Sequence, residues 1–250
     1  MPFSLCRPSN ANLKKTDVIK ISIKQIVESK NLSNQILQRR LDNPKDGFSK
    51  ARTKEKTMLL ALEGSSPTIR GENNYKYYVW EVYDKTKQAP ARLYVPGPAT
   101  ISTTGSPINI RKMANKATDF IKNHSGPIFL VGWSRGAAAC VQTALDLKRS
   151  SYAHKVEAMF LFDAVDQDGS TSDFLNFIPD NVVNAYHAIA TDKSWLDRQI
   201  FPTCARTSAP GVNLVPKTFH ATHGGIAGAG QSDGGSKEWM WNHLRNHGVI

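Results

Sequence analysis

Cysteine is scarce in this sequence, and its placement argues against two kinds of scaffold. The 250 residues include three cysteines, Cys6, Cys140 and Cys204, which lie far apart and form no CxxC pair. An odd number of scattered cysteines argues against a disulfide framework and against a cysteine-ligated zinc site. We therefore expect a globular domain that relies on its hydrophobic core, which a chain of this length is able to bury.

Long apolar runs are also missing. No stretch reaches the roughly 18 apolar residues of a membrane-spanning helix. The N-terminal segment MPFSLCRPSNANLKK lacks the apolar core of a signal peptide. These absences predict a chain that has no transmembrane segment and does not use the general secretion pathway. A cytoplasmic location and export by a specialised secretion system both stay open.

Acidic residues are few at the N-terminal end, where the charge is strongly positive. The formal net charge is +11, and residues 1–55 contain 12 Lys or Arg against 5 Asp or Glu. We interpret residues 1–56 as a basic N-terminal extension and linker, and residues 57–250 as a separate domain. Such an extension is either a solvated helix face or a contact surface for nucleic acid, anionic lipid or an acidic partner. Nucleic acid is disfavoured, because no recognised binding motif is present.

From residue 57 onward, short apolar runs alternate with segments of helical periodicity. Strands are expected at residues 57–64, 91–98, 127–132, 156–166 and 181–192, and residues 215–225 fit a strand that is followed by a glycine loop. Helices are expected at residues 110–124, 134–150 and 236–248, whereas residues 76–83 fit either a strand or a helix. The alternation predicts an α/β fold with a mostly parallel sheet flanked by helices.

The stretch PIFLVGWSRGAAAC places one serine between two glycines. A G-x-S-x-G pattern that follows a strand and begins a helix is typical of the nucleophile elbow of an α/β-hydrolase. Gly132 and Gly136 give room where the strand and the helix nearly touch, and the helix N-terminus favours negative charge. We therefore predict an α/β-hydrolase fold with Ser134 as the nucleophile. The alternative is a tight strand-to-helix turn with no chemistry.

A serine nucleophile requires a histidine base, and the triad of this fold runs Ser, Asp, His along the chain. His220 and His223 both follow the last expected strand, where the base belongs. His223 begins the glycine-rich loop HGGIAGAG, which would place its ring over Ser134. We predict His223 as the base rather than His220. His187 lies inside an expected strand and is interpreted as a packed or helper residue.

Two aspartates compete for the role of the triad acid. Asp163 ends the apolar run AMFLFD, and Asp192 ends the next expected strand, AYHAIATD. Both positions carry the acid in different α/β-hydrolases. We favour Asp163, because its carboxylate would emerge from a fully buried strand beside the elbow. Asp192 is kept as the alternative acid, or as a loop residue that pairs with Arg198.

An oxyanion hole requires two backbone N–H donors. The residue after the nucleophile, Arg135, is expected to supply one. The second is expected from the turn after the first strand, at Gly64 or Ser65. The chemistry needs neither a metal nor a cofactor. His220 and His223 are spaced like a metal-binding pair, but no third ligand with suitable spacing is evident.

Several blocks of this sequence, in order, resemble the DUF2235 family of α/β-hydrolases, which includes the Tle1-like phospholipase effectors of type VI secretion. The similar blocks are LALEGSS, RLYVPGPAT, GWSRGAAA, LFDAVD, VVNAYHAIATDKSWLDRQIFP, FHATHGGIAG and KEWMW. The resemblance covers about residues 57–250. Glu63 stands where the family has Asp, Ala164 where it has Thr, and DKSWLDR where it has an Asp-Glu-Arg block.

The resemblance implies Ser134, Asp163 and His223 as the triad of a lipase- or phospholipase-like serine ester hydrolase. It also implies an ester or phospholipid substrate and transient contact with a membrane surface. Two other functions stay open. One is a hydrolase fold that has lost activity and serves as a binding module. The other is binding to nucleic acid or an anionic surface through the basic extension.

Overall fold

The structure is a computed structural model, and it describes residues 57–65, 77–88, 91–98, 109–167, 170–194, 199, 202–229 and 232–250. The chain divides into two compact units, Met1–Lys54 and Glu55–Ile250, and every described residue belongs to the second. The predicted basic extension at residues 1–56 lies outside the described residues.

A parallel sheet forms the centre of the described unit. Its six strands are ordered β2-β1-β3-β4-β6-β8, and every neighbouring pair is parallel. The bounds are β1 Met58–Leu62, β2 Arg92–Val95, β3 Ile128–Trp133, β4 Val156–Phe162, β6 Val182–Ala190 and β8 Asn213–Phe219. The central strands read as unbroken apolar runs because both faces of the sheet are covered. β2 and β8 are the two edge strands, and most residues of β8 are exposed or half-buried.

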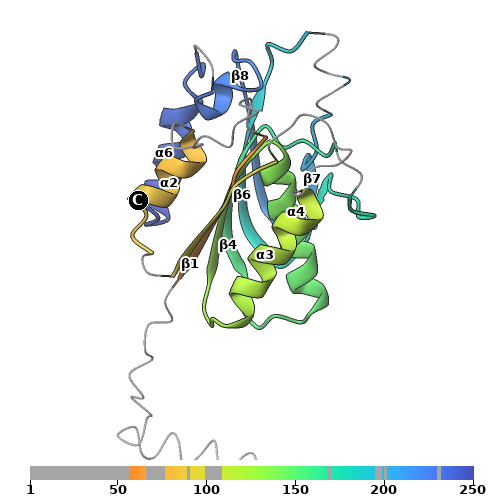
Figure 1. Cartoon of the computed structure of the whole chain (residues 1–250). Helices are drawn as coiled ribbons and strands as arrows, with labels where there is room; N and C mark the ends of the chain where they lie inside the picture. The colour runs from red at the N-terminus through yellow and green to blue at the C-terminus, as the bar shows by residue number, and fades with distance from the viewer. Residues whose placement is uncertain are drawn as a thin grey trace, which may run out of the picture. The chain divides into compact units, whose positions relative to one another are not determined.

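Helices cover both faces of this sheet (Figure 1). On one face lie α3 (Ile110–Lys122) and α4 (Arg135–Arg149), which pack with Leu60, Leu130 and Met159 in one hydrophobic cluster. On the other face lie α2 (Tyr78–Lys85) and α6 (Ser236–Asn246), which belong to a second hydrophobic cluster. The side chains of each buried strand alternate between the two clusters, as the two-residue period of a strand requires.

The strands and helices expected from residue 57 onward are present, and the structure adds two short strands and a short 3₁₀ helix, η2 (Gly225–Ala227). The ambiguous stretch 76–83 is helical: α2 buries Val79 and Val82, which lie three residues apart on one helix face. A small ribbon of β5 (Phe177–Ile178) and β7 (Thr207–Ser208) has no counterpart among the expected strands. The fold class expected from the sequence is confirmed. None of the described helices combines the length and the apolar character needed to cross a membrane.

The topology brings distant parts of the chain to one edge of the sheet. Because the strands are parallel, the segments that follow β1, β3, β4, β6 and β8 all leave the sheet on the same side. These segments contain the candidate residues Gly64, Ser65, Ser134, Asp163, Asp192 and His223. The fold therefore gathers at one place residues that are up to 159 positions apart in the sequence.

Candidate active site

The turn between β3 and α4 holds Ser134 in a strained conformation. The backbone of Ser134 has φ 55° and ψ −126°, a region that non-glycine residues rarely adopt. Two hydrogen bonds fix it: its N–H donates to the carbonyl of Phe162 at 3.0 Å, and its carbonyl accepts from the N–H of Val165 at 3.1 Å. The turn is thus tied to the end of β4, and the strain is held by surrounding structure.

The flanking glycines are required by close backbone contacts. A Cβ atom on Gly136 would lie 2.0 Å from the carbonyl oxygen of Leu62, and one on Gly132 would lie 2.7 Å from the nitrogen of Ala137. Both distances are far below any real Cβ contact. The sharp turn that exposes Ser134 above the sheet therefore depends on the absence of side chains at these two positions.

The imidazole of His223 lies between Ser134 and Asp163. Its Nε2 is 2.9 Å from the hydroxyl oxygen of Ser134, and its Nδ1 is 2.6 Å from Oδ2 of Asp163. Because a carboxylate only accepts, the proton of the neutral ring lies on Nδ1, and Nε2 is left to accept the Ser134 O–H. The indole N–H of Trp133 donates to the carbonyl of His223 at 3.0 Å and holds the loop in place. The structure thus brings these three predicted residues together.

Asp163 is fully buried at the end of β4. Burial raises the pKa of its carboxyl. The hydrogen bond and charge of His223 and the charge of Lys193 together lower this pKa by a larger amount, so it lies below its usual value. The Lys193 ammonium lies 2.7 Å from Oδ2, the same oxygen that accepts from His223. Asp163 is therefore ionised at neutral pH, with two donors on one oxygen.

Asp192 and His220 lie in a separate pair at the surface. The Asp192 carboxylate is 3.5 Å from Nδ1 of His220, whose side chain is 94% exposed. The hydroxyl of Thr191 also donates to Asp192, at 3.2 Å. The imidazole of His223 bonds to the carboxylate of Asp163 and not to that of Asp192. The expected partner of Asp192 as a loop residue, Arg198, lies outside the described residues.

The turn after β1 packs directly against the elbow, where the second oxyanion donor was expected. A Cβ atom on Gly64 would lie 3.0 Å from Cβ of Ser134, so the backbone of this turn approaches the nucleophile closely. The N–H of Gly64 donates to its neighbour, Oε1 of Glu63, at 3.0 Å. The hydroxyl of Ser65 accepts from Nε of Arg135 at 2.7 Å, and from Nη2 as well. Arg135, the other expected donor, begins α4 beside the serine.

Glu63 is a buried carboxyl for which the sequence indicated no role. Burial raises its pKa to about 8, although hydrogen bonds from the Gly64 N–H and the Tyr94 hydroxyl act in the opposite direction. The Tyr94 hydroxyl lies 3.3 Å from Oε2. Near pH 7 the side chain is therefore mostly protonated and neutral, and it adds no negative charge to the neighbourhood of the serine.

We predict that the protonation of Glu63 makes the free energy of unfolding depend on pH. The carboxyl keeps its proton in the folded state up to a pKa of about 8, whereas the unfolded chain releases it near 4.5. Folding therefore becomes less favourable as the pH rises between these values. Relative to Glu63→Gln, the wild type should lose roughly 3 kcal/mol of unfolding free energy between about pH 5 and 7.5. Urea unfolding of both proteins at these pH values measures this, and a pH-independent difference would contradict it.

His187 is a packed residue, one of the two roles expected for it. It is fully buried on β6, and its Nε2 accepts from the N–H of Ala164 at 3.1 Å while Nδ1 donates to the carbonyl of Ala205 at 3.1 Å. Burial lowers its pKa to about 4, so the ring is neutral. His187 therefore fixes the backbone that follows Asp163.

Two residues of this site were not found by sequence reasoning, Glu63 as a buried neutral acid and Lys193 as a buried ammonium. Each looks like an ordinary charged residue beside a strand, and only its burial sets it apart. Among the described residues, no group of three or more His, Cys, Asp or Glu side chains is placed to hold a metal ion.

Among the comparisons with known proteins, the one with solved structures finds similar folds. No protein-family model and no curated protein matches it. An uncharacterized protein from Pseudomonas aeruginosa is similar, with a TM-score of 0.51 at 14% identity over 88% of this chain and 50% of that one. A Vlm2 thioesterase domain gives 0.47 at 10% identity, over 80% and 96%. An α/β serine hydrolase without a lid from Xanthomonas campestris gives 0.40 at 9%, over 77% and 83%.

The chain has the α/β-hydrolase fold. It combines the parallel sheet, the helices on both faces and the strand–turn–helix of the elbow. It spans half the length of the Pseudomonas aeruginosa protein, and at these identities the likeness concerns the fold alone.

Proposed function

We propose that this protein is a serine ester hydrolase that acts through an acyl-enzyme. The observation that carries the proposal is the continuous hydrogen-bonded chain from the Ser134 hydroxyl through His223 to Asp163. A hydroxyl held at 2.9 Å from a neutral imidazole nitrogen is placed to lose its proton as it attacks a carbonyl carbon.

In the first half of the reaction, Ser134 Oγ bonds to the ester carbonyl carbon and its proton passes to Nε2 of His223. The negative charge of Asp163 stabilises the imidazolium that forms. The tetrahedral oxyanion is held by backbone N–H groups at the start of α4 and in the turn after β1, with Arg135 and Ser65 as the proposed donors. The imidazolium then protonates the leaving alkoxide, which departs as an alcohol.

In the second half, water takes the place of the alcohol. His223 removes a proton from water as the hydroxide attacks the acyl carbon, and Ser134 leaves with that proton. The products are a carboxylic acid and the free enzyme. For Gly64 to act as an oxyanion donor, its N–H has to leave Oε1 of Glu63 and bond to the oxyanion instead. One N–H group cannot make two short, linear hydrogen bonds at once.

The substrate class that we propose is a lipid or phospholipid ester. It is supported by the resemblance of the elbow, the histidine loop and the flanking blocks to the DUF2235 hydrolases. A panel of soluble short-chain esters and phospholipid vesicles separates a general esterase from a phospholipase.

The proposal predicts that a fluorophosphonate probe labels Ser134 covalently. Ser134→Ala should remove the labelling completely while the circular dichroism spectrum and melting temperature stay close to those of the wild type. Ser150→Ala, a change on the exposed end of α4, is the matched control and should label like the wild type. Labelling that persists in Ser134→Ala would exclude Ser134 as the nucleophile, and a folded wild type that never labels would favour the inactive binding module.

A further inference from the structure

Lys193 is a charged residue bound to the proposed triad that the mechanism above does not use. It follows β6, and its side chain is only 6% exposed. The ammonium lies 2.7 Å from Oδ2 of Asp163 and donates to the hydroxyl of Thr203 at 3.0 Å. A lysine is almost never buried unless it is paired, so this placement is a specific feature of the site.

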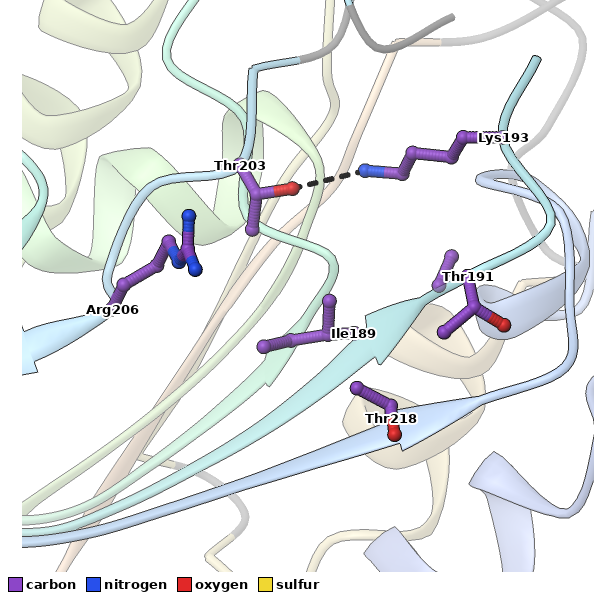
Figure 2. A pocket seen from close by; sticks show the side chains of 7 residues that line it. Ile189, Thr191, Lys193, Thr203, Arg206 and Thr218 are labelled. Carbon is purple, nitrogen blue, oxygen red and sulfur yellow. Dashed lines mark hydrogen bonds between the residues drawn. The ribbon is translucent and has the colours of Figure 1, made fainter. Parts of the chain in front are cut away.

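Figure 2 shows the pocket that Lys193 lines. A cavity of about 360 Å³ separates the ends of β6 and β8 from the segment before β7, and Lys193 and Arg206 are the cationic residues that line it. The Lys193 side chain reaches across to Thr203, and the hydrogen bond between them is drawn as a dashed line. The ammonium is therefore held from two directions, by Thr203 and by Asp163.

We propose that Lys193 is a positioning residue that acts through Asp163 and keeps His223 in its neutral, basic form at lower pH. This inference rests on the proposed function. Lys193 and His223 bond to the same carboxylate oxygen, so the ammonium and the imidazole lie within two hydrogen-bond lengths of each other. Protonation of His223 would place two cations around one carboxylate, and a neighbouring like charge disfavours the charged form of a histidine.

Other titratable groups of the described residues lie near the site. Glu63, after β1, is mostly protonated near pH 7 because burial raises its pKa to about 8, and His187, on β6, is neutral because burial lowers its pKa to about 4. The guanidinium of Arg135 at the start of α4 bonds to Ser65. Asp192 and His220 pair with each other at the surface. Among the described hydrogen bonds, His223 is joined to the charge of Asp163 and, through Oδ2 of that carboxylate, to the charge of Lys193.

The arrangement also orients the carboxylate. Oδ2 accepts both hydrogen bonds, while Oδ1 is buried and has no hydrogen-bond partner among the described residues. A carboxylate with one anchored oxygen would otherwise be able to rotate and offer either oxygen to the imidazole. The ammonium of Lys193 selects Oδ2 and so fixes the direction from which His223 is held.

The test is a titration of His223 in the full chain, by NMR of histidines labelled with ¹³C at Cε1. The His223 signal is assigned from its absence in His223→Gln. In Lys193→Met the midpoint of His223 should rise by at least about one pH unit, because a like charge has been removed. Lys193→Arg, which keeps the charge, should return the midpoint toward the wild type. Lys148→Met removes a lysine from an exposed ion pair and should leave the midpoint unchanged.

A second variant guards against misfolding. Lys193→Met leaves a buried carboxylate with one partner fewer, whereas Lys193→Gln replaces the ammonium with an uncharged hydrogen-bond donor on a side chain one atom shorter. Lys193→Gln should raise the midpoint in the same direction. An unchanged midpoint in either folded variant overturns the proposal.

The rate of fluorophosphonate labelling as a function of pH gives the functional readout. The acidic limb of the profile should move with the midpoint, whereas loss of a merely structural contact would lower labelling at every pH alike. The two proposals fail differently. If the wild type never labels but the Lys193 variants show the raised midpoint, the hydrolase proposal is contradicted. If the wild type labels at Ser134 but the variants show no change of midpoint, the role of Lys193 is contradicted.

Discussion

Asp163→Asn should lower turnover on a soluble ester by about four orders of magnitude. The asparagine has two ways to face His223, and both fail. Its NH₂ group would force the proton of the ring onto Nε2, where it blocks acceptance of the Ser134 proton. Its carbonyl would keep the correct tautomer but carries no charge, so the imidazolium would form beside the Lys193 ammonium without a counter-ion.

Asp192→Asn is the matched control for this change. The Asp192 carboxylate is half exposed and contacts Thr191 and His220 at the surface, so its loss should leave turnover within a few-fold of the wild type. Turnover is compared at equal concentrations of folded protein, as judged by circular dichroism. The reverse ranking of the two variants would transfer the acid role to Asp192 and leave Asp163 as a residue that shapes the turn after β4.

Gly136→Ala should destabilise the protein by at least about 3 kcal/mol. The added Cβ would lie 2.0 Å from the carbonyl oxygen of Leu62 and 2.5 Å from that of Glu63. Both are backbone atoms of β1 and its turn, so no side-chain rotation relieves the overlap. The start of α4 would have to move away from β1 and carry Ser134 with it. A displacement of about 1 Å is enough to cost roughly a hundredfold in rate, so probe labelling should fall as well.

Urea unfolding followed by circular dichroism measures the loss of stability. Gly224→Ala is the matched control, because its new Cβ would have no neighbour closer than 3.4 Å and its backbone is in the right-handed helical region. That variant should change stability by less than about 1 kcal/mol. A Gly136→Ala protein as stable as the wild type would show that β1 and α4 are not in the close contact described here.

The residues that could be predicted from the sequence are those whose role is encoded locally. The elbow is recognisable because its glycines, its serine and the alanines of α4 lie within one short stretch. Asp163 stands out because a charged residue ends an unbroken apolar run. His223 stands out because it opens a glycine-rich loop after the last strand. Each signal can be recognised without knowing which residues are close in space.

Lys193 and Glu63 illustrate what a single sequence does not contain. A lysine after a strand is usually solvated, and Lys193 is buried because Asp163, which lies 30 positions earlier, meets it at the sheet edge. The pKa of Glu63 is raised by its complete burial in the folded chain, where the Tyr94 side chain lies beside it. The helical form of residues 78–85 is likewise stabilised by the ring of Tyr78 packing against Trp241. These properties follow from tertiary contacts between residues that are distant in the sequence, and the local pattern of residues does not reveal such contacts.

The edge of the sheet formed by β8 has a consequence for how the protein behaves at high concentration. An edge strand with free backbone donors and acceptors is a template on which another chain can add a strand and begin aggregation. Pro216 in the middle of β8 has no N–H to offer, and the neighbouring Lys217 is exposed and charged. A strand added along this edge would lose a ladder hydrogen bond at the proline and would have to desolvate the ammonium. At this edge of the sheet, β8 thus disfavours the addition of a further strand, and it also leads into the loop that holds His223.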